Sequence, residues 1–168
     1  MTTGEKIKRI RIFRGMTQKE LGVLAGLGEP NANIRIAQYE CDARIPRANL
    51  LDKFAQVLKV NPLNFHSPVP GSAEDVIQTL FWMEEEIPGA ICLTQLVGTP
   101  DETNPFPNIV VQHSDSDEQA TEATTGLYFQ DSVMNNYLRE WLLHQQELRR
   151  GEITRDQYFE WKLNWPYT

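Results

Sequence analysis

The sequence predicts an all-α domain of five short helices over residues 1–66, followed by a small α+β module over residues 73–168. Apolar residues recur at helical spacing through the first part, whereas runs rich in β-branched residues, which are typical of strands, occur in the second. A Pro- and Gly-rich run at residues 67–72 separates the two parts and predicts a linker. We expect the second domain to combine about three helices with two or three short antiparallel strands.

Charge is divided unequally between these two parts. The chain of 168 residues has a formal net charge of −7. Residues 1–66 carry 11 Lys and Arg against 6 Asp and Glu, a net charge of +5, and residues 67–168 carry 5 against 17, a net charge of −12. Such asymmetry is typical of a nucleic-acid-binding part joined to an acidic part.

Other features of the composition exclude several classes of protein. No apolar run is long enough to cross a membrane, and the polar start lacks the apolar core of a signal peptide. Cys41 and Cys92 are the only cysteines, and their spacing matches neither a metal site nor a disulfide framework. We therefore expect a cytoplasmic protein with no membrane segment.

The first two helices are marked by apolar spacing and by a cap. Ile7, Ile10 and Phe13 recur at helical intervals, and a glycine at position 15 ends this helix. Thr17 and Glu20 stand at the spacing of a capping box, which predicts the start of a second helix. The Gly- and Pro-containing run at residues 26–31 ends it.

Three further helices complete the first domain. Apolar residues at helical spacing predict helices at 32–40 and 48–58. Asn61 followed by Pro62 is a cap and first-turn signal for a short fifth helix through Phe65. Together these five segments form a compact all-α domain.

The acidic half alternates helical and extended patterns. Helices are predicted at 73–86, at 131–149, which has a long apolar stripe, and after the capping residue Thr154. Residues 91–97 and 109–113 have strand character, and 127–129 is a shorter candidate strand. Residues 99–105 and 114–125 are predicted loops, the second of them polar and acidic.

A set of residues at characteristic positions runs through about residues 4–66. In order, they are Arg11, Gly15, Thr17, Gln18, Leu21, Gly22, Gly26, Ile36, Tyr39, Glu40, Pro46, Phe54, Ala55, Leu58 and Val60. With these residues the segment resembles the lambda-repressor-like (Cro/cI, or Xre) helix-turn-helix family. The resemblance implies a DNA-binding domain whose third helix enters the major groove. It also implies a scaffold ion pair between Arg11 and Glu40, and a small residue at Gly22 where the third helix crosses the second.

The chain departs from the family pattern at two places. The turn between the second and third helices is longer than usual by about four residues, with residues 27–31 in the excess. Asp42 stands where the family often has glycine two residues after the glutamate. Aspartate tolerates the left-handed backbone region better than most residues, so we expect this turn to persist.

Family roles imply a set of DNA-contacting residues. Arginine can bind guanine in the major groove, and asparagine or glutamine can bind adenine. The resemblance places a phosphate-facing glutamine at the start of the second helix, groove-facing residues on the third, and backbone-facing arginines in the loop that follows. These residues are Gln18, Asn33, Ile34, Arg35, Ala37, Gln38, Arg44 and Arg47.

Catalysis is not expected in the acidic half. Self-cleaving repressors need a lysine beside a serine, and Lys162, the only lysine after residue 66, lies in a helix rich in tryptophan. The histidines at 66, 113 and 144 are scattered, the run at 84–86 has the character of a charged helix end, and no phosphate-binding glycine loop is present. We expect no enzyme activity, no cofactor and no metal site.

The aromatic stripe of the acidic half suggests an assembly surface. The stripe runs from Val133 to Leu148 and continues with Tyr158, Trp161 and Trp165. We expect residues 67–168 to form a homodimer contact, with Trp141 at the interface or in the core beneath it. A ligand pocket is a further reading of the same aromatic residues.

These observations favour a sequence-specific DNA-binding transcriptional regulator, and specifically a repressor, that binds double-stranded DNA through the helix at 32–40. The alternative is an antitoxin-like or adaptor protein whose acidic half binds a partner protein. A basic protein encoded beside it would favour the alternative.

Overall fold

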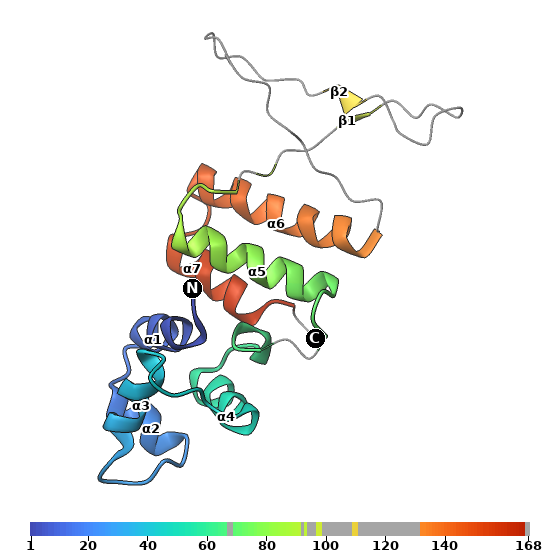
Figure 1. Ribbon diagram of the computed structural model, residues 1–168. Helices are drawn as coiled ribbons and strands as arrows, with labels where there is room; N and C mark the ends of the chain where they lie inside the picture. Colours follow the sequence, from blue (N-terminus) through green and yellow to red (C-terminus); the bar gives the residue numbers. More distant parts are fainter. Residues whose placement is uncertain (67–68, 92, 94–96, 99–108, 111–131, 167–168) are drawn as a thin grey trace.

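The computed structural model describes residues 1–66, 69–91, 93, 97–98, 109–110 and 132–166. Seven α-helices and one short 3₁₀ helix make up almost all of the regular structure in these ranges. Helices α1 to α4 gather at one end of the molecule, and α5, α6 and α7 pack together at the other (Figure 1). Within the described residues, none of the helices combines the length and apolar character that a membrane crossing requires.

The first half contains α1 (Thr3–Phe13), α2 (Gln18–Leu24), α3 (Ala32–Glu40), α4 (Ala48–Leu58) and the 3₁₀ helix η1 (Pro62–Asn64). Helices α1 and α2 each begin with a capping box. In each, the hydroxyl of the N-cap threonine accepts from the backbone N–H of the glutamate at N3, and the side chain of that glutamate accepts from the backbone N–H of the threonine. The expected fifth helix is a single 3₁₀ turn, capped by Asn61.

The described part of the second half is helical. Its elements are α5 (Ala73–Glu86), α6 (Ser132–Arg150) and α7 (Arg155–Asn164). Ser72 caps α5, and Thr154 begins α7 with a third capping box. Gly151, with φ +72°, allows the tight turn between α6 and α7.

The three helices of the second half bury one another's apolar faces. Phe81 on α5 makes edge-to-face contacts with Trp141, Trp161 and Trp165, whose ring centres lie 4.9, 5.2 and 5.4 Å away. Trp141 is fully buried. The apolar stripe of α6 therefore forms the core of the second half, and Trp141 lies in that core.

The prediction of a C-terminal α+β module is wrong. In the described residues, strand pairing is confined to β1 (Val97–Gly98) and β2 (Ile109–Val110), two residues each and antiparallel. Ile91 and Leu93 are not in a strand, and the side chain of Gln145 on α6 bonds to both of their backbones. The core needs no sheet, because α5, α6 and α7 cover it together. The remaining residues of the three expected strands, with the expected loops at 99–105 and 114–125, lie outside the described residues.

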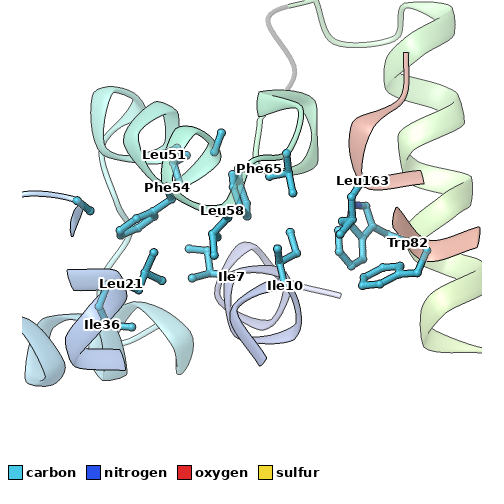
Figure 2. Packing of buried hydrophobic residues seen from close by; sticks show 14 residues of the cluster. Ile7, Ile10, Leu21, Ile36, Leu51, Phe54, Leu58, Phe65, Trp82 and Leu163 are labelled. Atoms are coloured by element: carbon cyan, nitrogen blue, oxygen red, sulfur yellow. The ribbon is translucent and has the colours of Figure 1, made fainter. Parts of the chain in front are cut away.

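The core of the first half includes side chains of the second. Ile7, Leu21, Ile36, Phe54 and Leu58 pack at its centre, and Trp82 and Leu163 close one side of it (Figure 2). Phe159 belongs to the same cluster. Phe159 on α7 lies edge-on to Phe13, with ring centres 4.9 Å apart. The run at 67–72 therefore separates two regions of opposite charge along the sequence. In the structure, one apolar core contains residues from both regions.

Backbone hydrogen bonds also join the two halves. The carbonyl of Leu163, at the end of α7, accepts from the backbone N–H of Asn61 at 2.9 Å and from the side-chain amide of Asn64 at 2.7 Å. Asn64 is buried, so these bonds are shielded from water. They fix η1 against the last turn of α7.

Acidic residues of the second half face the cationic side of α1. Arg14 pairs with both carboxylate oxygens of Glu160, one at 2.9 Å, and hydrogen bonding from Arg14 holds the pKa of Glu160 below its usual value. Arg9 lies 3.5 Å from Glu85. Lys6 lies over the ring of Trp82, where burial lowers the pKa of its amine although Asp75 opposes this. Three cations of α1 are therefore occupied within the chain.

The shared core predicts that the two halves unfold together. Phe159→Ala should lower the free energy of unfolding of the full chain by about 3–5 kcal/mol, because it opens a cavity between α1 and α5. The exposed Leu143→Ala is the control and should have little effect. Urea unfolding should be followed by tryptophan fluorescence, which reports the second half, and by far-UV circular dichroism, which reports all helices. Separate midpoints for the two signals would contradict a common core.

Candidate nucleic-acid interface

Helices α2 and α3 cross at very short distance. A Cβ atom built on Gly22 would lie 2.8 Å from the Cβ of Ala32 and 2.9 Å from its carbonyl oxygen. Leu21 and Ile36 are fully buried beside this crossing. Glycine at position 22 is therefore what allows α3 to lie across α2 at this depth.

The face of α3 that points away from the core is open to solvent. Ala32, Ile36 and Glu40 are buried, and they repeat at the four-residue interval that marks one side of a helix. The opposite side carries exposed and half-buried residues, which are Asn33, Ile34, Arg35, Ala37 and Gln38. The four groove-facing candidates from the sequence, which are Asn33, Ile34, Ala37 and Gln38, and the neighbouring Arg35 thus share one accessible surface, which we call the α3 face.

A buried ion pair holds α3 in place. Arg11 on α1 donates through Nε to Glu40 Oε1 at 2.5 Å and through a terminal nitrogen to Glu40 Oε2 at 3.0 Å. Both residues are buried. Gln18, at the start of α2, donates its amide to Glu40 Oε2 at 2.9 Å. Glu40 therefore ties the first three helices together, and Arg11 also donates to the carbonyl of Met16.

Gln18 has a role that the sequence did not reveal. It was expected to face phosphate, and it is half-buried with its amide bonded to Glu40. Its neighbour Thr17 donates from its backbone N–H and its hydroxyl to Glu20, each at 2.7 Å, and these bonds hold the pKa of Glu20 below its usual value. The start of α2 is thus rigid on both sides of Gln18.

Asp42 explains one departure from the family pattern. Its φ is +57°, so it adopts the left-handed conformation that glycine usually supplies. Its carboxylate accepts from the Gly4 backbone N–H at 3.1 Å and from the Thr2 hydroxyl at 2.5 Å. The aspartate therefore ties the end of α3 to the start of α1, which a glycine could not do.

The longer turn folds along the outer side of α2. Glu29 pairs with Lys19 at 2.9 Å, and both side chains are exposed. A shallow hollow between the turn and α2 is lined by Lys19, Glu20, Val23, Leu24 and Glu29. The ion pair directs Glu29 toward α2. The sequence had left open how the added residues at 27–31 would be placed.

The loop after α3 adds two cations beside the α3 face. Arg44 and Arg47 are exposed, and the backbone N–H of Arg44 donates to the carbonyl of Gln38 at 3.1 Å, which anchors the loop to α3. Pro46 is buried between them. Within the described ranges, no carboxylate lies within ion-pair distance of Arg35, Arg44 or Arg47. The surface can therefore offer guanidinium and amide donors to an anionic partner.

Polar residues buried in the second half bond to one another. Glu84 accepts from the hydroxyl of Tyr158 at 2.9 Å, from Lys162 at 3.2 Å and, through its other oxygen, from Gln145 at 2.9 Å. Burial raises the pKa of Tyr158, and the Glu84 carboxylate adds to this shift. Lys162 is itself buried and also pairs with Glu85. The acidic end of α5 thus neutralises the one lysine of α7 within the core.

Dimerisation through residues 67–168 stays a prediction. Much of the stripe on α6 is buried against α5 and α7, with Val133 and Leu143 exposed on its outer side.

No protein-family model matches the chain, and no curated protein matches it.

Breaking the Arg11–Glu40 pair should destabilise the protein strongly. Arg11→Ala or Glu40→Ala in the full chain should each lower the free energy of unfolding by about 3–5 kcal/mol, because either change leaves a buried charge without its partner. The exposed pair Lys19–Glu29 offers a matched control. Lys19→Ala should cost less than about 1 kcal/mol. Equal losses for the two pairs in urea titrations would contradict the structural role of the buried pair.

Gly22→Ala should destabilise the chain, although alanine ordinarily favours a helix by about 0.5–1 kcal/mol over glycine. The added methyl would collide with Ala32, and we expect a net loss of about 1–3 kcal/mol. Ala32→Gly in the same chain should restore only part of this, because the carbonyl of residue 32 remains close. Thermal unfolding of both variants measures the effect. A Gly22→Ala protein more stable than the parent would contradict the close crossing.

Proposed function

We propose that this chain is a sequence-specific DNA-binding transcriptional regulator of the lambda-repressor-like helix-turn-helix class, acting as a repressor. The observation that carries the proposal is the α3 face, a solvent-open row of amide, guanidinium and apolar side chains on a helix fixed by buried contacts. A rigid helix of this kind suits the major groove, where specificity requires side chains held in fixed positions.

The side chains of the α3 face match the chemistry of base edges. Asn33 and Gln38 each carry an amide that can bond to adenine through both N6 and N7, and Arg35 can bond to guanine. Arg44 and Arg47 suit the phosphates that flank the groove. The hydrogen bond to Glu40 fixes the side-chain amide of Gln18 at the N-terminus of α2. Glu40 also bonds to Arg11, so the Arg11–Glu40 pair that holds α3 in place also orients this amide.

The distribution of charge supports the same orientation. Arg9 on α1 and Arg14 at its C-cap pair with Glu85 and Glu160 of the second half, and Lys6 lies over the ring of Trp82. The arginines beside the α3 face have no such partner among the described residues. DNA approaching the α3 face meets open cations, and the acidic helices α5 to α7 lie on the other side of the first half (Figure 1).

Selection of bound sequences from random DNA by the full-length protein tests the proposal. Gln38→Ala and Asn33→Ala should weaken binding to the selected duplex by about 1–3 kcal/mol more than binding to unrelated DNA, because each removes a contact to a base edge. Equal weakening on both DNAs would exclude α3 as the recognition helix.

Arg44→Ala and Arg47→Ala should behave differently from the changes on α3. Each should weaken binding to both DNAs alike and reduce the slope of log affinity against log salt concentration by about 1. Arg155→Ala on α7, also an exposed arginine, is the matched control and should change neither quantity. If selection returns no common sequence and the protein instead binds a basic partner, the antitoxin-like or adaptor function replaces the proposal.

A further inference from the structure

Ile34 is an unusual residue for its position. It is 53% exposed, while Ile36, two positions later on the same helix, is fully buried. Its neighbours on the α3 face are polar or small. Single exposed apolar residues are common on this protein, and Leu24 and Ile45 are more exposed than Ile34. What distinguishes Ile34 is its place among the amide and guanidinium side chains of the α3 face, where a duplex in contact with those side chains would also meet an apolar group.

The position of Ile34 on the helix defines what that contact can reach. Successive residues of a helix turn by 100°, which places residues 34 and 38 on the side opposite the buried residues Ala32 and Ile36. Residues 34 and 38 are also one turn apart and therefore adjacent on the surface. Ile34, which is exposed, and Gln38, which is half-buried, are thus neighbours on the side of α3 away from the core, with an apolar group on one turn and an amide on the next.

The major groove offers few apolar groups. Its base edges present hydrogen-bond donors and acceptors, and the one hydrocarbon group among the four bases is the C5-methyl of thymine. An isoleucine placed on a donor or acceptor would remove it from water without replacing its hydrogen bond, which is unfavourable. A thymine methyl, by contrast, gains from the same contact.

We propose that Ile34 determines specificity by packing on the C5-methyl of a thymine, within about two base pairs of an adenine that Gln38 contacts. The spacing follows from the helical turn of about 5.4 Å and the base-pair rise of about 3.4 Å. This inference rests on the proposed DNA-binding function. Replacement of that thymine by cytosine removes the methyl and presents an amino group to an isoleucine that cannot accept from it.

Deoxyuridine provides a direct test, because it keeps every hydrogen-bonding group of thymine and lacks only the methyl. The duplex selected by the full-length protein is synthesised with deoxyuridine at each thymine in turn, and the affinity of each duplex is measured. At one thymine of the site, the wild-type protein should lose about fourfold in affinity, the value expected for one buried methyl group.

The variant Ile34→Ala identifies the side chain responsible. It should bind the thymine and deoxyuridine duplexes equally at that position, while Ile34→Val should keep most of the difference because it retains a branched apolar group. Met83→Ala, which removes an exposed apolar side chain from α5, is the matched control and should show the same fourfold difference as the wild type. Circular dichroism of each variant verifies that α3 is intact.

The possible outcomes distinguish failure of this inference from failure of the proposed function. If selection yields a common sequence but no thymine shows a methyl effect, or if Ile34→Ala retains that effect in full, DNA recognition stands and the assignment of Ile34 is overturned. A selected sequence without thymine in contact with α3 overturns it equally. If selection yields no common sequence, the proposed function fails and the inference fails with it.

Discussion

The position of the candidate interface depends on one buried carboxylate, that of Glu40. Arg11 from α1 and Gln18 from α2 both donate to it, and it ends α3 itself. A buried charge is costly unless its partners are complete, so the three helices have one arrangement in which this group is satisfied. The direction in which the α3 face points is therefore set by polar contacts, with the close approach at Gly22 setting its depth.

The two halves of the chain form one mechanical unit. Trp82, Phe159 and Leu163 complete the first core, and the carbonyl of Leu163 holds η1 through two donors. A displacement of α7 relative to the first half would break these two hydrogen bonds and the packing of Phe159 and Leu163 in the first core. The contacts therefore couple the position of α7 to that of η1.

Signals between residues close in the sequence were sufficient to predict the helices. Contacts between residues far apart in the sequence were not predicted. Thr17 and Thr154 cap helices where expected, because a cap acts within three residues of itself. The strand prediction failed around Ile91, because a side chain from α6, more than fifty residues away, takes its backbone bonds. On α3, helical period alone predicts which residues are exposed. The bond from Gln18 to Glu40, the use of Asp42 and the folding of the turn onto α2 depend on distant partners, which a single sequence does not display.

The separation of charge also gives the described part of the chain an electric dipole. Its first half carries a net charge of +5, and the described residues of its second half carry 5 Lys and Arg against 10 Asp and Glu, a net charge of −5. Arg9 and Arg14, which lie nearest the second half, are paired with Glu85 and Glu160, so the positive end of this dipole lies toward α3 and the loop after it. An external electric field exerts a torque on such a dipole, so it orients the molecule as well as attracting it.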